Sequence, residues 1–145
     1  LNVFNDISVS ELHKRGILPT VSAELNAKQV LNMKNKVFIY YTHGQIPVMH
    51  FKGVYPQRAL TDEINYTFPL RTVNGNTEML YSRPIAVFEK VQELIAGGVK
   101  WFLLDLTKDT TTIIRAYQNI INDVKKDISM LKKGTTIGNY VKGVA

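Results

Sequence analysis

Apolar residues along this chain recur in short runs, and segments with helical spacing lie between the runs. The clearest runs are VFIYYTH at 37–43 and VKWFLLDLT at 99–107, which are rich in β-branched and aromatic residues. Such composition is typical of strands covered on both faces. Two shorter runs, LNVF at 1–4 and ILPTVS at 17–22, predict further strands. The pattern therefore predicts four strands.

Helix signals follow these runs. Ser8 with Glu11 three positions later predicts a capping box for a helix that ends at Gly16. Asn26 with Gln29 predicts the start of a second helix. The most amphipathic segment is TTTIIRAYQNIINDVKK, whose apolar residues fall on one helical face: Ile113, Ile114, Tyr117, Ile120, Ile121 and Val124.

Residues 50–82 interrupt this alternation. Asn74, followed by glycine, lies between two strand-like runs and can supply the positive φ angles of a tight turn, which predicts a β-hairpin at about 64–81. Ser82 then predicts the start of a helix that ends at Gly97. The insertion therefore separates the third strand from its helix.

Strands that alternate with helices favour a parallel α/β architecture. Two arrangements fit, a small doubly wound sheet and half of an eight-stranded barrel. We prefer a TIM-barrel-like half barrel of four strand-helix units with an inserted β-hairpin, because the chain begins inside a strand and four units are half of a full set. Residues 1–145 then form one α/β domain, a fragment of a longer chain, with strand-helix units and insertion at 1–126 (insertion at about 50–82) and a C-terminal tail at 127–145.

Composition narrows the function classes. A chain of 145 residues, 45% hydrophobic and 21% charged, suits a globular domain. The absence of cysteine excludes disulfides and a cysteine-bound iron–sulfur cluster, so no cofactor is expected within this chain.

No apolar run reaches the roughly 18 residues of a membrane span, and the start lacks a signal-peptide pattern. We therefore expect a cytoplasmic protein without membrane contact. The net charge of +6 is spread over scattered basic residues, which we interpret as solvated surface.

Polar side chains follow each predicted strand, where parallel α/β folds gather their binding residues. They are Asn5, Ser22, Glu24, His43 and Asp105. Glu24, His43 and Asp105 are the candidate catalytic residues, since carboxylate and imidazole groups suit acid–base chemistry on an amide. Asn5 and Ser22 are candidate substrate-binding residues.

Each candidate also has a structural interpretation. Asn5 can lead into a helix cap, and Glu24 can complement a helix N-terminus. His43 can be a core histidine bonded to a backbone carbonyl. Asp105 interrupts an apolar strand, where an unpaired charge is costly, so it is the strongest candidate. His43 and His50 lack the spacing of metal ligands, so no metal site is expected.

An ordered series of segments resembles the bacterial collagenase-like peptidases, peptidase family U-thirty-two. The segments, which cover nearly the whole chain, are LNVFN, VSAELN, YTHGQIPVM, LTDEINYTFPL, TEMLYSRPIAV, GVKWFLLDLT and TIGNYVKGV. The chain resembles the C-terminal half of that family's core domain. The resemblance implies a TIM-like barrel and a peptidase of unknown catalytic type. Relatives are implicated in hydroxylation of RNA and quinone precursors with an iron–sulfur cluster.

Four positions of this chain match motifs of that family. Glu24 matches the Glu of its Ser-x-Glu-Leu segment, His43 its His-Gly pair, Met49 its Leu-Met pair and Asp62 the Asp of its Asp-Arg pair. From the inserted segment we take Asp62 and Arg71 as further candidate substrate-binding residues.

The chain also departs from the family pattern. Glu63, Tyr81 and Asn139 stand where the family often has Arg, Asn and His, and the cysteines that many members carry after the Leu-Met pair are missing. These departures favour a chain that has lost part of the family's chemistry.

Three functions remain open. The first, which we favour, is a peptidase that acts on peptides or proteins. The others are an RNA-modifying or nucleic-acid-binding protein and a non-catalytic, degenerate partner subunit. A half barrel leaves strand edges and an apolar face uncovered. We therefore also expect a homodimer, or contact with the missing half of the barrel.

Overall fold

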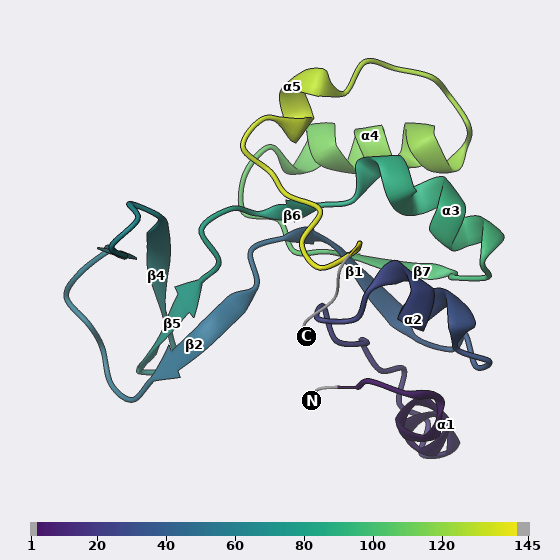
Figure 1. Ribbon diagram of the computed structural model, residues 1–145, viewed down its shortest axis with the longest axis horizontal. Coiled ribbons are helices and arrows are strands. Elements are labelled where there is room, and N and C mark those ends of the chain that lie inside the picture. Colours follow the sequence, from purple (N-terminus) through teal and green to yellow (C-terminus); the bar gives the residue numbers. More distant parts are fainter. Residues whose placement is uncertain (1–2, 142–145) are drawn as a thin grey trace. The chain divides into compact units, whose positions relative to one another are not determined.

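The chain divides into two compact units (Figure 1). The computed structural model describes residues 3–141. The main unit comprises Leu1–Gly44 and Ile85–Ala145, and the inserted unit comprises Gln45–Pro84. Each unit is built around its own sheet.

The secondary structure alternates only in part between strands and helices. In chain order the elements are α1 (Asp6–Lys14), α2 (Ala27–Asn32), β1 (Ile39–Gly44), β2 (Pro47–Phe51), β3 (Ala59–Thr61), β4 (Thr67–Val73), β5 (Asn76–Leu80), β6 (Ile85–Ala86), a 3-10 turn (Phe88–Lys90), α3 (Val91–Ala96), β7 (Trp101–Leu104), α4 (Thr110–Ile121) and α5 (Ser129–Lys132). Among the described residues, no helix is long and apolar enough to cross a membrane.

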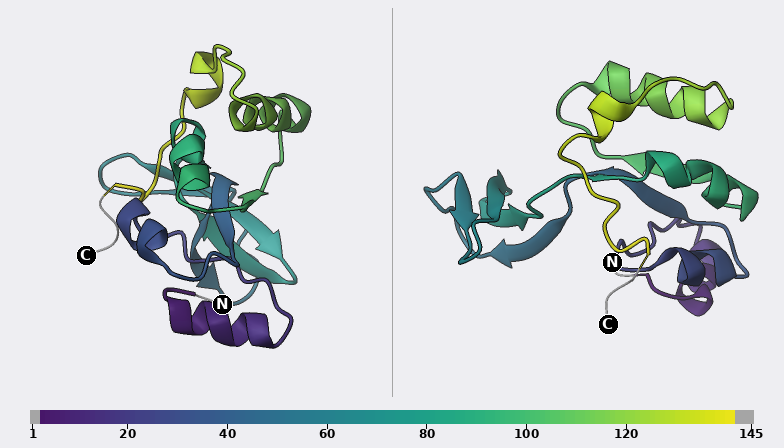
Figure 2. Two further views of the ribbon diagram at one scale, coloured as in Figure 1. Left: turned by 90° about the vertical axis from the view of Figure 1, so that its right-hand side faces the viewer. Right: turned by 45° about the horizontal axis from the view of Figure 1, so that its top comes forward.

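The main unit contains a three-stranded sheet in the order β6-β1-β7. β1 pairs with β7 in parallel and with β6 antiparallel. Helices α3 and α4 lie next to each other on the same side of this sheet (Figure 2). Their apolar residues form the core with residues of β6 and β7, and this core includes Phe88, Val91, Ile113 and Tyr117.

The predicted half barrel of parallel strand-helix units is wrong. Antiparallel pairs dominate the structure, and β1–β7 is the one parallel ladder between the named strands. The runs at 1–4 and 17–22 contribute only the isolated parallel bridges Val3–Val21 and Thr20–Ile39. Residues 1–2 lie outside the described range. The second run is short and contains a proline, which lacks the N–H group that a ladder needs.

The helix predicted from Ser82 begins later than expected. Ile85 and Ala86 form β6 instead, opposite Gly44 and His43 of β1. Helical structure starts at Phe88 and continues to Ala96, and Gly97, where the sequence places the helix end, is the C-cap of α3. An apolar pair at 85–86 can extend a helix or a strand, and the contact with β1 selects the strand.

Local capping signals are partly realised. Asn26 and Gln29 form the predicted capping box of α2. The cap of α1 is different, because Asn5 accepts the hydrogen bond from the Ser8 backbone N–H at 2.9 Å, and α1 begins at Asp6. An amide side chain at this position satisfies one of the free N–H groups of the first turn.

The inserted unit is a four-stranded antiparallel sheet in the order β2-β5-β4-β3. Asn74 and Gly75 form the turn between β4 and β5, and both have positive φ angles (49° and 75°). This is the geometry that their sequence predicts.

Candidate functional site

Tyr41 and Asp105 form a polar pair near the C-terminal ends of β1 and β7. The Tyr41 hydroxyl donates a hydrogen bond to Oδ2 of Asp105 at 3.3 Å. The backbone N–H of Asp105 donates to the carbonyl oxygen of His43 at 2.8 Å. Both side chains are half-buried, so the pair is held in place and still reached by solvent.

Gly44 makes this close approach possible. Its φ angle is 139°, in a region that side-chain-bearing residues rarely adopt. A Cβ atom at Gly44 would lie 2.4 Å from the Tyr41 hydroxyl oxygen and 2.6 Å from the carbonyl oxygen of Asp105. The glycine therefore leaves the space that the Tyr41–Asp105 pair occupies.

The side chains of His43 and Tyr41 face opposite sides of the sheet, although their spacing predicts one side. Tyr41 lies opposite Leu103 and His43 lies opposite Leu104, so the register shifts between them. Side chains alternate along a regular strand, and a bulge reverses that alternation. Leu104 packs against the helical core, whereas Asp105 bonds Tyr41 on the other side. The bulge therefore separates the imidazole from the carboxylate.

His43 lies in the core of the main unit. The residue is 6% exposed, and its ring packs edge-on against Phe88 and Tyr117. Nδ1 lies 3.2 Å from the Tyr117 hydroxyl, which donates to the carbonyl oxygen of Thr42. Tyr117 has one proton to donate, so we assign the proton of this contact to His43 Nδ1.

Burial keeps these two groups neutral. It lowers the pKa of His43 below its usual value of 6.5. It also raises the pKa of Tyr117, although a backbone hydrogen bond partly opposes this effect. A charged imidazole would lose hydration in this site without gaining a carboxylate partner.

The other strand-end candidates have local roles. The Ser22 hydroxyl accepts a hydrogen bond from the Glu24 backbone N–H at 3.2 Å and is buried. Glu24 is exposed on the turn that follows. Within residues 3–141, the Glu24 side chain forms no hydrogen bond or ion pair with His43 or Asp105. The amide of Asn5 caps α1.

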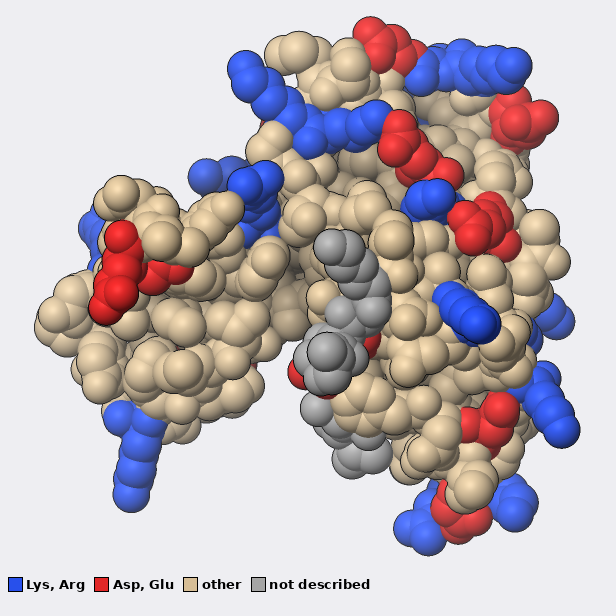
Figure 3. Space-filling model, in the orientation of Figure 1, with Lys and Arg blue, Asp and Glu red and all other residues tan. Residues whose placement is uncertain are grey.

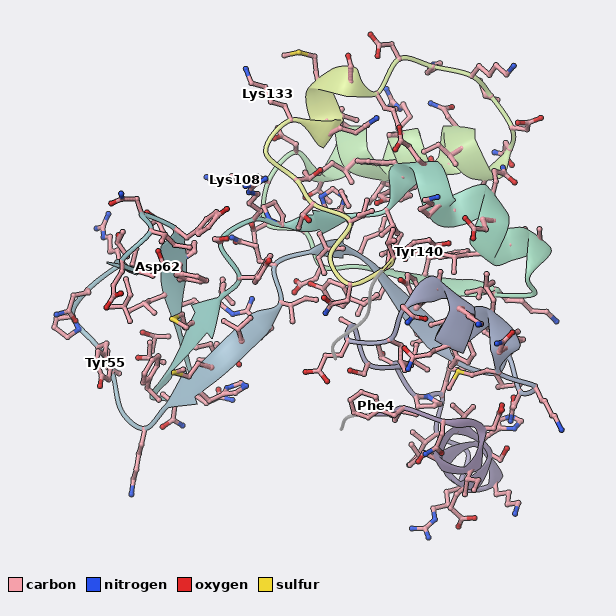
Figure 4. The ribbon with its side chains drawn as sticks, in the orientation of Figure 1. Phe4, Tyr55, Asp62, Lys108, Lys133 and Tyr140 are labelled. Carbon is pink, nitrogen blue, oxygen red and sulfur yellow. The ribbon has the colours of Figure 1, made fainter. Side chains whose placement is uncertain are left out.

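Asp62 and Arg71 belong to the inserted unit. Asp62 Oδ1 accepts hydrogen bonds from the backbone N–H groups of Ile64 and Tyr66, at 3.0 and 2.8 Å, and so closes the turn between β3 and β4. Figure 4 labels Asp62 beside β4. Arg71 Nε donates to Glu78 Oε2 at 2.7 Å across β4 and β5.

The structure thus brings Asp105 together with Tyr41, which the sequence pattern does not indicate as a site residue. Tyr41 looks like an ordinary apolar residue of a buried run. Tyr41 lies opposite Leu103, and residues two positions apart on a strand share a face. This register is the signal that places Tyr41 on the same face as Asp105. That register depends on the pairing of distant strands.

The described residues form neither a cluster of metal ligands nor, on the face drawn in Figure 3, a continuous basic surface for a polyanion. No group of three or more His, Asp or Glu side chains within residues 3–141 could hold a metal ion. Lysines and arginines alternate with acidic residues over the face of the main unit drawn in Figure 3. Such mixing gives a weak attraction for a phosphate backbone.

Comparison with known proteins gives no neighbour for this site. No protein-family model, curated protein or solved structure matches the chain.

Proposed function

We propose that this chain is a peptide-bond hydrolase of the collagenase-like peptidase type, in which Asp105 acts on the substrate and Tyr41 orients Asp105. The observation that carries the proposal is the Tyr41–Asp105 hydrogen bond near the ends of two parallel strands. The ordered family-like segments support a peptide as the substrate. As part of the same proposal we place the protein in the cytoplasm, because it has no cysteine.

Asp105 is the general base of this mechanism. Its carboxylate takes a proton from a water molecule while the water oxygen bonds to the peptide carbonyl carbon. The proton then passes to the amide nitrogen, and the carbon–nitrogen bond breaks to release an acid and an amine. Tyr41 orients the carboxylate through its hydroxyl, and His43 positions Asp105 through its backbone carbonyl.

Release of fluorescent peptides from labelled gelatin and casein by the purified chain tests this proposal. We expect Asp105→Asn to lower the rate by about 10²-fold or more, because loss of a general base has this effect. Tyr41→Phe should cause a smaller loss, since the carboxylate remains. Equal melting temperatures for these variants would exclude unfolding as the cause.

A matched control uses another carboxylate of the main unit. Asp123 is exposed and has a φ of 55°, which asparagine adopts readily. Asp123→Asn should leave hydrolysis unchanged. Equal loss in both aspartate variants would contradict a specific role for Asp105.

A second candidate is a non-catalytic subunit that binds peptides. The observation that favours it is the position of the His43 imidazole, which is buried away from Asp105. The same assay separates the two functions. Binding of labelled gelatin without hydrolysis, weakened by Asp105→Asn, would support the binding subunit and reject the hydrolase.

A further inference from the structure

Strand β7 forms a free edge of the sheet in the main unit, whose order is β6-β1-β7. The opposite edge, β6, is covered: Ile85 forms a parallel bridge with Thr136, and the Ala86 N–H donates to the Thr136 carbonyl oxygen at 2.8 Å. Among residues 3–141, β1 is the only strand that pairs with β7, and no isolated bridge reaches β7. The outer side of β7 therefore has no ladder partner in the described part of the chain.

Hydrogen bonding to β1 shows which backbone groups of β7 point outward. The Asp105 N–H donates to the His43 carbonyl oxygen, so it points toward β1. Successive residues of a strand direct their N–H and C=O groups to alternate sides. The extra residue of the bulge, Thr42, lies in β1, so this alternation continues along β7. The N–H and C=O groups of Phe102 and Leu104 therefore point away from β1.

This edge lacks the features that usually protect a free edge, which are charged side chains, proline or a covering segment. β7 has the sequence WFLL, without charge or proline. In the inserted unit, by contrast, the edge strand β2 begins with Pro47, and the edge strand β3 is followed directly by Asp62. Outward donors and acceptors between apolar side chains suit the backbone of an extended polypeptide, which adds to such an edge as a further strand.

The position of Asp105 indicates which polypeptide this is. Asp105 directly follows β7, so a strand paired with Phe102 and Leu104 continues past the Asp105 carboxylate. Adjacent strands lie about 4.8 Å apart, which leaves room for one water molecule between this carboxylate and a peptide carbonyl group. That water is the nucleophile of the proposed hydrolysis. Two copies of the chain, by contrast, each carry a charge of +6 and would repel each other.

We propose that the free edge of β7 binds the substrate as an added strand, whose backbone bonds to Phe102 and Leu104 beside Asp105. That this peptide is a substrate rests on the proposed function, whereas strand addition rests on the sheet alone. Trp101, which is 38% exposed, and Leu103 share a face with Asp105. Side chains on one face of neighbouring strands interact, so the edge should favour apolar side chains on this face of the peptide.

Emission of Trp101, the only tryptophan of the chain, reports binding at this edge. The probe is a capped hexapeptide of alternating threonine and valine, residues that favour strands. A form with every second backbone nitrogen methylated keeps one hydrogen-bonding edge, and a form with every nitrogen methylated has no donors. We expect saturable binding of the first two peptides with dissociation constants within about threefold. The fully methylated peptide should bind at least tenfold more weakly, because its hydrogen bonds to β7 are lost.

Proline substitutions locate the site in the full chain. Leu104→Pro removes an outward N–H of β7 and should weaken binding of the unmethylated peptide at least tenfold. Thr61→Pro is the matched control: Arg58 and Asp62 bond toward β4, so the Thr61 N–H points outward from the edge of the other sheet. This variant should bind within twofold of the unchanged chain. Leu104 packs against the helical core, so the methylated peptides, which leave the chain unaltered, decide the question should Leu104→Pro fail to fold.

Equal binding of all three peptides, equal loss for both methylated forms, or no binding would overturn the proposal, even where labelled gelatin is hydrolysed. The expected order of binding without hydrolysis of gelatin would confirm strand addition and reject the proposed hydrolase. Sedimentation showing a dimer that Leu104→Pro dissociates would assign the edge to a second copy and overturn the proposal.

Discussion

Gly44 is the residue on which the candidate site most depends. It lies at the end of β1, where its missing side chain lets the Tyr41 hydroxyl approach Asp105. The sequence shows only that a glycine ends an apolar run. The structure shows why a larger residue would displace the pair.

Gly44→Ala should destabilise the protein by about 1–3 kcal/mol, as other overpacked sites do. The methyl group would meet Tyr41 and Asp105 at distances that atoms do not tolerate. Urea denaturation measures this loss. Gly16→Ala is the control, because Gly16 also has a positive φ of 73° but has nothing within 4 Å of the added Cβ. An equal effect of both substitutions would show that backbone strain alone is responsible.

His43 should make stability depend on pH. Its pKa is lowered by burial in the folded state, so below about pH 6.5 the unfolded chain takes up a proton that the folded chain refuses. Above that pH, His43 is neutral in both the folded and the unfolded chain, so it should contribute no pH dependence to the free energy of unfolding. It should fall as the pH decreases toward the lowered pKa.

Urea denaturation between about pH 7.5 and 5 measures this dependence. His43→Gln should flatten the curve, since the variant keeps the exposed His13 and His50 and loses only the buried imidazole. An unchanged slope in the variant would show that other groups cause the acid sensitivity.

In the secondary structure, several local signals in the sequence are confirmed, although the predicted helix starts at Ser8 and Ser82 are wrong, and the non-local strand pairing is not predicted. The capping box of Asn26 and Gln29 and the amphipathic helix α4 depend on residues within a few positions of each other, and both are present. The bulge after Tyr41 depends on how β1 pairs with β7, sixty residues away in the chain. No pattern inside β1 reveals it, so the predicted grouping of His43 with Asp105 could not have been corrected from the sequence.

A lysine that follows helix α2 in the sequence caps the C-terminal end of this helix. Lys36 Nζ donates to the carbonyl oxygens of Val30 and Leu31 at 2.8 and 2.7 Å. These carbonyls belong to the last turn, where intrahelical donors are missing. The burial of Lys36 lowers its pKa, whereas nearby Asp6 opposes this shift.

Lys36→Met should therefore destabilise the protein by about 1–2 kcal/mol, because the two carbonyls lose a charged donor. Thermal unfolding followed by circular dichroism measures the effect. Lys34→Met is the control, since Lys34 is exposed and neither α2 carbonyl bonds to it. A loss of less than about 0.5 kcal/mol for Lys36→Met would show that water satisfies these carbonyls equally well.

At the scale of the whole molecule, the inserted unit joins the main unit at two adjacent positions. Gly44 and Ile85 lie directly opposite each other in the antiparallel β1–β6 pair. All of the inserted unit, Gln45–Pro84, lies between them. The main unit therefore closes its sheet without any strand of the insertion.

Replacing residues 45–84 by the dipeptide Asn-Gly should leave a folded main unit, because this turn suits an antiparallel pair. Trp101 fluorescence and a cooperative thermal transition measure folding. A shortened chain without a cooperative transition would show that the main unit needs the insertion.

The direct test of Asp105 as the general base is the rate of labelled-gelatin hydrolysis by the unchanged chain, measured beside Asp105→Asn and Asp123→Asn. We expect the rate of hydrolysis to fall about 10²-fold or more with Asp105→Asn and to stay unchanged with Asp123→Asn. Hydrolysis by a folded Asp105→Asn variant at the unchanged rate would contradict the assignment of the Tyr41–Asp105 pair as the reactive site.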